Sequence, residues 1–141
     1  MLQSLYTMQT LTLYNDIEVY CVPAKSFPQG IAEAHDKLHS LITFVPGRKY
    51  FGISHGSPKG VVYFAAANEL EPGELSKHSL EKYTIKKGNY IYIDLKDYMK
   101  NVASIGEAFQ QLLADKRISP DGECIEWYSS PTDCRCMVRI G

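Results

Sequence analysis

An internal repeat is the feature that most constrains how this chain can fold. The segment Gly30–Leu38 aligns with Ser104–Leu112 at a spacing of 74 residues, with isoleucine, glutamate, alanine and leucine identical at matching positions. At the same spacing, Ile17 aligns with Ile91, Val19 with Ile93 and Pro46 with Pro120. Matches in three separate segments at one spacing indicate a duplicated structural unit.

Each copy of the repeat contains the same series of predicted elements. A strand with alternating apolar residues comes first, at Asp16–Val22 and at Asn89–Leu95. An amphipathic helix follows, and a proline–glycine breaker ends it. Its apolar stripe is Ile31, Ala34, His35, Leu38, Leu41 and Ile42 in the first copy, and Ile105, Ala108, Phe109, Leu112 and Leu113 in the second. A hairpin closes each copy, at Lys49–His55 with Gly60–Ala67 and at Glu123–Tyr128 with Cys134–Ile140.

This order of elements predicts an α+β fold, a tandem β-α-β-β repeat with antiparallel sheet and two helices. We expect residues 1–10 to be an N-terminal lead and 11–141 to be the domain. Within it, the repeat units span about 15–67 and 85–140, and residues 68–84 form a surface linker. Two such units can meet about a pseudo-twofold axis, and the joint between them would form a central ligand cleft.

The bulk properties exclude several classes of protein. A net charge of −1 gives no basic footprint, so direct nucleic-acid binding is not expected. No apolar run is long enough to span a membrane. A signal peptide begins with a positively charged region, whereas residues 1–10 contain no lysine or arginine. The four cysteines include no Cys-x-x-Cys pair, and Cys134-x-Cys136 has no second ligand pair. We therefore expect a cytoplasmic protein with reduced cysteines and with no cofactor or metal.

The strand Cys124–Tyr128 carries a carboxylate among aromatic residues. Strand alternation places Ile125 and Trp127 on one face, with Cys124, Glu126 and Tyr128 on the other. Burying a carboxylate is costly unless a partner pairs with it. The partner of Glu126 is either a ligand or a side chain such as Arg135, Arg139 or Lys49.

Three segments carry a resemblance to a known family: Gly88-x-Tyr90, Ile105–Phe109 and Pro120–Tyr128. In their order and spacing, the chain resembles the GyrI-like small-molecule-binding domain, the effector-binding domain of bacterial AraC- and MerR-type multidrug regulators. The resemblance covers roughly residues 9 to 140. It implies two β-α-β-β units around a cleft that binds lipophilic, often cationic, compounds. It also implies that Glu126 matches a pocket glutamate on the next-to-last strand.

The family's regulators also carry a helix-turn-helix domain, which this sequence lacks outside the repeat. The resemblance therefore implies a stand-alone member that senses or sequesters a small-molecule ligand, or takes part in transcription regulation through a separate regulator protein. Two alternatives stay open. One is a hydrolase of strained electrophiles such as cyclopropane-bearing alkylators, with Glu126 as general acid or base. The other is a protein-binding inhibitor or modulator, with gyrase as the partner.

We expect the ligand-binding residues to surround Glu126. Burial would raise the pKa of its carboxyl, and a lipophilic cation would gain charge pairing and cation–π contacts with nearby rings. In the second copy the candidates are Glu126, Tyr128, Tyr90, Tyr92 and Trp127, although the parity of Trp127 predicts packing beneath a helix. In the first copy the counterpart of Glu126 is Phe51 or Gly52. Gly52 would leave space for a ligand, with Tyr50 close by.

His35 and His39 lie four residues apart on one predicted helix face, a spacing that could bind a metal. They occupy the places of Phe109 and Leu113 in the second copy. Packing at the edge of the core therefore explains both histidines, and we expect no metal site there.

Overall fold

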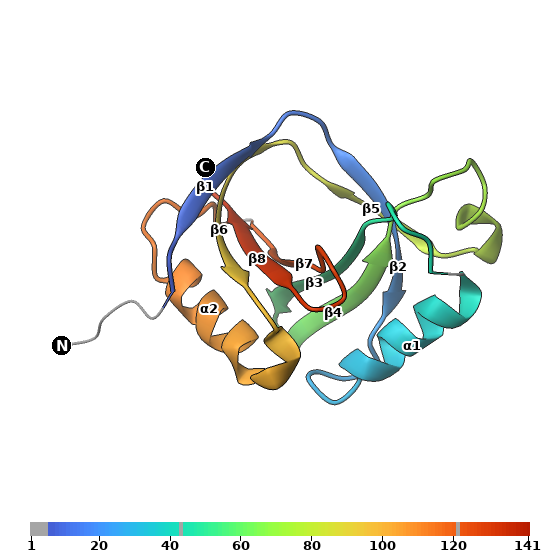
Figure 1. Cartoon of the computed structure of the whole chain (residues 1–141), viewed down its shortest axis with the longest axis horizontal. Coiled ribbons are helices and arrows are strands. Elements are labelled where there is room, and N and C mark those ends of the chain that lie inside the picture. Colours follow the sequence, from blue (N-terminus) through green and yellow to red (C-terminus); the bar gives the residue numbers. More distant parts are fainter. Residues whose placement is uncertain (1–5, 43, 121) are drawn as a thin grey trace. The chain divides into compact units, whose positions relative to one another are not determined.

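The elements of the chain form two units. The computed structural model describes residues 6–42, 44–120 and 122–141. Unit 1 combines the N-terminal residues up to Asn15 with Lys87–Gly141, and unit 2 is the continuous segment Asp16–Lys86. Within the described residues, each unit contains four antiparallel strands and one α-helix (Figure 1). None of the helices in these residues is long and apolar enough to cross a membrane.

Unit 2 contains the first copy of the repeat. Its elements are β2 (Ile17–Pro23), α1 (Ile31–Leu41), β3 (Tyr50–Ser57), β4 (Gly60–Ala67), the short 3-10 helix η1 (Ser76–His78) and β5 (Glu81–Ile85). The strand order is β3-β4-β2-β5, and every pairing is antiparallel. Helix α1 packs against β4 and β2, and it buries Ala34 and Leu38 there.

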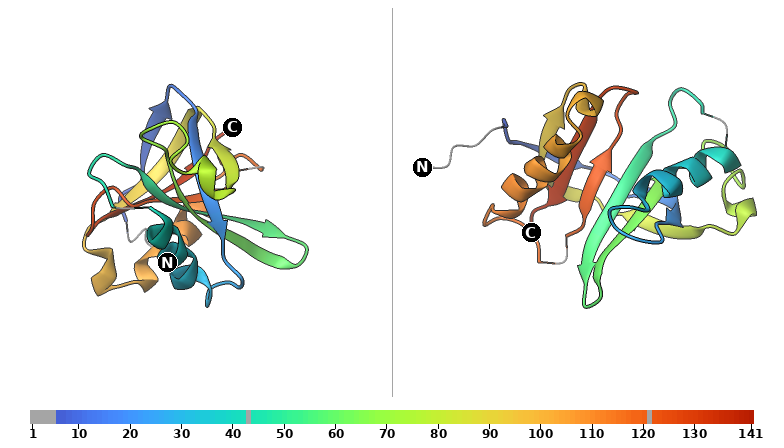
Figure 2. Two further views of the ribbon diagram at one scale, coloured as in Figure 1. Left: turned by 90° about the vertical axis from the view of Figure 1, so that its right-hand side faces the viewer. Right: turned by 90° about the horizontal axis from the view of Figure 1, so that it is seen from below.

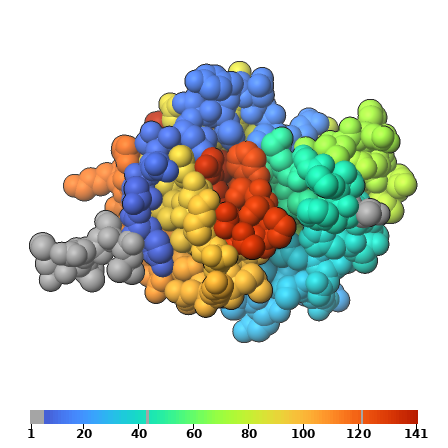
Figure 3. All heavy atoms as spheres, viewed as in Figure 1, coloured from blue at the N-terminus to red at the C-terminus, as the bar shows by residue number. Residues whose placement is uncertain are grey.

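Unit 1 contains the second copy. Its elements are β1 (Gln9–Leu13), β6 (Gly88–Leu95), the 3-10 helix η2 (Tyr98–Lys100), α2 (Ala103–Leu113), β7 (Cys124–Trp127) and β8 (Cys134–Arg139). The strand order is β1-β6-β8-β7, again antiparallel. Strands β1, β6 and β8 lie side by side in Figure 3. Helix α2 packs against β8 and β6 through Ala108, Phe109 and Leu112, and Figure 2 shows each helix lying along one face of its own sheet.

The predicted α+β class, with antiparallel sheet and two helices, is confirmed. The structure adds two strands to the predicted elements. Strand β1 begins at Gln9 and pairs with β6, while β5 lies, except for its last residue, inside the segment predicted as a linker and pairs with β2. Strand β1 directly precedes β2 in the chain but belongs to unit 1, and β5 directly precedes β6 but belongs to unit 2. The strand that comes just before each copy of the repeat therefore pairs within the unit of the other copy. We call this arrangement the strand exchange.

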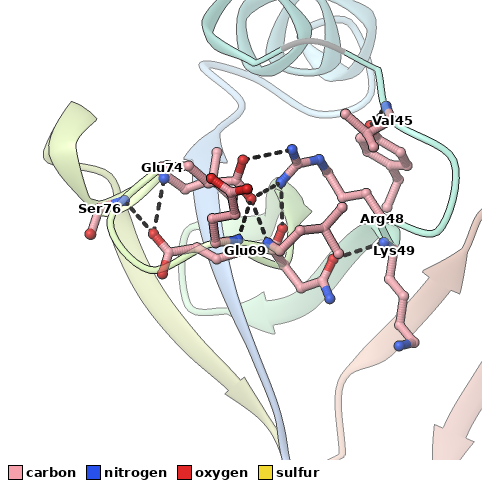
Figure 4. A network of polar contacts seen from close by, with 11 residues as sticks. Val45, Arg48, Lys49, Glu69, Glu74 and Ser76 are labelled. Atoms are coloured by element: carbon pink, nitrogen blue, oxygen red, sulfur yellow. Dashed lines mark hydrogen bonds and ion pairs between the residues drawn. The ribbon is translucent and has the colours of Figure 1, made fainter.

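A buried arginine fixes the connection between β4 and β5 (Figure 4). Arg48 is 7% exposed, and its guanidinium donates to both carboxylate oxygens of Glu74, at 2.8 and 3.0 Å, and to the carbonyl of Asn68 at 2.9 Å. The Arg48 guanidinium lowers the pKa of Glu74 to about 2. The neighbouring Glu69 carboxylate accepts the backbone N–H of Leu75 at 2.9 Å, and the Leu75 side chain is fully buried. The segment predicted as a surface linker therefore contributes to the core of unit 2.

Replacing Arg48 by methionine tests this network, because methionine keeps an apolar stem and removes the guanidinium. We expect R48M to lower the free energy of unfolding by roughly 2 kcal/mol, measured by urea denaturation, since hydrogen bonds between charged groups are lost at a buried site. The matched control is K25M, which breaks the exposed Lys25–Glu33 ion pair and should change stability by less than about 0.5 kcal/mol. Equal effects of the two substitutions would contradict the role given to Arg48.

Candidate functional site

Glu126 lies in the middle of β7, and only 8% of the residue is exposed. The register places Glu126 opposite Cys136 of β8, which in turn lies opposite Ile93 of β6. Ile93 and Cys136 belong to the core cluster that contains Phe109 and Leu112 of α2. Directly opposed residues of antiparallel strands point to the same side of a sheet. Glu126 therefore points to the face of unit 1 that α2 covers.

Two tyrosines accompany Glu126 on this face. The Tyr128 hydroxyl donates a hydrogen bond to a carboxylate oxygen of Glu126. The Tyr98 ring lies 5.7 Å from the Tyr128 ring, centroid to centroid, at an interplanar angle of 50°. Burial raises the pKa of Tyr98, and the nearby Cys134 and Glu126 raise it further. We call Glu126, Tyr128 and Tyr98 the Glu126 cluster.

Tyr98 was not among the residues predicted for the site. It belongs to η2, outside the strands and helices that the periodicity of the sequence indicates. Its position in the sequence was the signal that could have indicated it. Tyr98 lies in the short connection between β6, which ends at Leu95, and α2, which begins at Ala103.

Tyr90, Tyr92 and Trp127 point to the opposite face of the unit 1 sheet. The register pairs Tyr92 with Met137 and Trp127 with Arg135, positions that alternate with the helix-covered ones. The Arg135 guanidinium lies 4.2 Å from the centre of the Tyr92 ring and 6.0 Å from that of Trp127, and it also pairs with Asp94 at 2.7 and 3.1 Å. These two rings thus contact a cation of the protein itself.

Trp127 lies on the face of its sheet opposite the one that α2 covers, so α2 is not a helix beneath which it packs. Strand alternation correctly separated Trp127 from Glu126. It could not indicate which of the two faces the helix covers. Tyr90, which is 2% exposed, lies opposite Arg139 on the same side as Trp127.

The other two predicted site residues, Tyr50 and Gly52, belong to unit 2. Both lie on the face of β3 that α1 covers, where the Tyr50 ring packs 5.0 Å from His39 and stacks 5.6 Å from Phe44. Phe51 alternates with them and points to the other face. Of the two proposed counterparts of Glu126, Gly52 therefore has the matching position relative to the helix of its own unit.

His35 and His39 make separate packing contacts rather than facing a common point. His35 Nε2 lies 2.8 Å from the Tyr63 hydroxyl, whereas the His39 ring packs against Tyr50. Burial lowers the pKa of His35 to about 4, and the nearby His39 also lowers it. Within residues 6–42, 44–120 and 122–141, no group of three or more His, Cys, Asp or Glu side chains is arranged to hold a metal ion.

Unit 2 also has a hollow of about 290 Å³ on its surface. It is lined by Glu18, Tyr20, Glu69, Leu70, Glu71 and Pro72. Two of its carboxylates have partners within the protein, because Glu18 pairs with Lys82 at 3.3 Å and Glu69 accepts backbone N–H groups. We therefore regard the Glu126 cluster as the stronger candidate site.

The structure of the chain is similar to several solved protein structures. No protein-family model and no curated protein sequence matches the chain. An integron cassette protein from the mobile metagenome of Vibrio cholerae matches with a TM-score of 0.65 and 16% identity, over 95% of each chain. SAV2435, solved bound to tetraphenylphosphonium, matches with a TM-score of 0.59 and 9% identity, over 96% of this chain and 93% of that one. The EcmrR C-terminal domain matches with a TM-score of 0.58 and 12% identity, over 96% of each chain. At these identities the comparisons show a shared fold.

The half-buried His35 should make the stability of the protein depend on pH. Its pKa is lower in the folded protein than in the unfolded chain, so the unfolded chain binds an extra proton between pH 6.5 and about 4. Stability should therefore be full well above pH 6.5 and fall by about 3 kcal/mol as the pH drops to 4. H35Q keeps a polar partner for Tyr63 and should remove the part of the pH dependence that His35 contributes. Urea denaturation at a series of pH values measures the free energy of unfolding.

The control for this measurement is H39Q, which removes an exposed histidine from the same helix. It should leave most of the pH dependence of the free energy of unfolding in place, because burial lowers the pKa of His35 more than His39 does. If H35Q retains the full dependence of the wild type between pH 6.5 and 4, His35 is not its source.

Proposed function

We propose that this chain is a GyrI-like small-molecule-binding protein that binds lipophilic aromatic cations through Glu126. The observation that supports this most strongly is the burial of the Glu126 carboxylate beside two tyrosine rings, on the helix-covered face of its sheet. Glu126 would supply the charge that attracts the ligand, and Tyr128 and Tyr98 would supply aromatic contact surface.

The surroundings of Glu126 favour an organic cation over a small metal ion. A strongly hydrated ion loses much solvation energy when it enters a site among apolar and aromatic groups. Attraction to the charged groups of the site must offset that loss. A lipophilic cation is weakly hydrated, gains apolar burial and interacts with tyrosine faces through cation–π contacts. The Tyr128 hydroxyl can hold the carboxylate in place for such a ligand.

The comparisons support the proposal at the level of fold. One protein of the same fold was solved with tetraphenylphosphonium, a lipophilic aromatic cation, and another is the C-terminal domain of EcmrR. The order of the segments Gly88-x-Tyr90, Ile105–Phe109 and Pro120–Tyr128 supports membership of the GyrI-like family. We infer that binding serves multidrug sensing or sequestration in a bacterial cytoplasm, with an effect on transcription through a separate regulator protein.

The substitution E126Q tests the proposal, because glutamine keeps the shape and polarity of the side chain and removes its charge. With tetraphenylphosphonium as the probe, we expect isothermal titration calorimetry to record binding to the wild type. We expect E126Q to weaken that binding by roughly tenfold to a hundredfold, the range of a charge pair in a partly desolvated site.

Two controls isolate the charge of Glu126. E123Q removes a carboxylate three residues earlier in the chain and should leave the affinity within about twofold. Triphenylphosphine oxide, a neutral compound of similar shape, should bind the wild type and E126Q equally. If E126Q binds tetraphenylphosphonium as tightly as the wild type, the ion-pair account of this site is wrong.

A further inference from the structure

The position of Tyr98 depends on the turn that joins β7 to β8. Asp97, immediately before η2, has a left-handed backbone with φ of 51°, which costs free energy for a residue other than glycine. Its N–H donates to Asp133 Oδ1 at 3.2 Å, and the Lys96 ammonium contacts Asp133 Oδ2 at 3.1 Å. The Tyr98 N–H donates to the Thr132 carbonyl at 3.0 Å.

Asp133 is itself held in a defined orientation. Its backbone N–H donates to Ser130 Oγ at 3.1 Å, and its carboxylate accepts the Thr132 hydroxyl at 3.0 Å. The Asp97 N–H, followed by Lys96, holds the pKa of Asp133 below its usual range, so the carboxylate is ionised at neutral pH. We call Asp133, with the Asp97 N–H and the Lys96 ammonium that it binds, the Asp133 latch.

The latch connects to the Glu126 cluster through a short path. Tyr98 follows Asp97 directly, its ring packs against Tyr128, and Tyr128 binds the Glu126 carboxylate. The flanking side chain Met99 is 68% exposed, so packing on that side does little to fix η2. The Tyr98 ring also packs against the core of unit 1, so the backbone bonds from Asp97 and Tyr98 to the turn share the restraint on the ring with that packing.

We propose that Asp133 is a positioning residue, which holds the Tyr98 ring where it forms one wall of the Glu126 site for an aryl-bearing cation. This inference rests on the proposed function for its ligand, and it adds a residue outside the site that controls affinity. Loss of the latch frees η2, so that the ring no longer lies in place before the ligand arrives. Binding then includes the cost of ordering that ring.

A double-mutant cycle tests whether Asp133 acts through Tyr98. Tetraphenylphosphonium affinity is measured for the wild type, D133A, Y98L and the double variant. We expect D133A and Y98L each to weaken binding by about tenfold, and D133A to add less than about twofold in the Y98L background. Additive effects in the double variant would overturn the proposal, because they would mean that Asp133 acts by another route.

Conservative variants and a matched control separate positioning from general stability. D133N keeps an oxygen acceptor for the Asp97 N–H, and Y98F keeps the ring, so both should bind within about threefold of the wild type. D115A removes a comparable aspartate, which binds Arg117 in the segment that follows α2. It should lower the free energy of unfolding about as much as D133A does while leaving the affinity unchanged. A D115A affinity as weak as that of D133A contradicts the assignment.

A measurement without ligand separates this inference from the proposed function. In protein with carbon-13-labelled tyrosine, NMR titration follows the pKa of the Tyr98 phenol, identified by its absence in Y98F. Burial and Glu126 raise this pKa in the wild type, so D133A should move it back toward that of a free tyrosine. An unchanged pKa in D133A refutes the latch, even if tetraphenylphosphonium binds. If the pKa moves and the wild type does not bind the cation, the latch holds and the proposed ligand class is wrong.

Discussion

Each unit of this protein depends on one packing constraint: a single amphipathic helix must cover one face of a four-stranded antiparallel sheet. In unit 1, Ala108, Phe109 and Leu112 of α2 bury Ile93 and its neighbours. Side chains alternate along a strand, so the choice of covered face at β6 decides the direction of every side chain on β8 and β7. That choice brings Glu126 to the helix side and Trp127 to the other. A shift of one residue in the register of β7 would exchange the two.

Two buried charged side chains, Arg48 and Glu126, are accommodated in different ways. Arg48 in unit 2 meets a carboxylate and a backbone carbonyl, and these bonds fix the connection that carries Leu75 into the core. Glu126 in unit 1 accepts a hydrogen bond from the Tyr128 hydroxyl and lies near the phenol of Tyr98. An arginine bound on two sides suits a structural role, whereas a carboxylate beside aromatic rings suits recognition of a cation.

The repeat predicted the helices, the hairpins and the α+β class, because the periodicity of the side chains is a local signal. It missed β1 and β5, since the partner of each lies far away in the sequence and each strand is only five residues long. For the site, alternation grouped Glu126 with Tyr128 and set Trp127 apart. It could not assign the helix to a face, nor show that the Arg135 guanidinium makes cation–π contacts with the rings of Tyr92 and Trp127. Tyr98 was missed because contacts with a distant turn, rather than periodicity, decide its position.

The strand exchange sets an order in which the chain can fold as it is synthesised. Unit 2 is continuous and has all its strands once Lys86 has left the ribosome. Strand β1 is made before any of unit 2, yet its partner β6 follows only after unit 2 is complete. At typical rates of translation, β1 waits on the order of ten seconds without its partner. The threonines that alternate with leucine in β1 keep this segment partly polar, which protects an unpaired strand from aggregation during that interval.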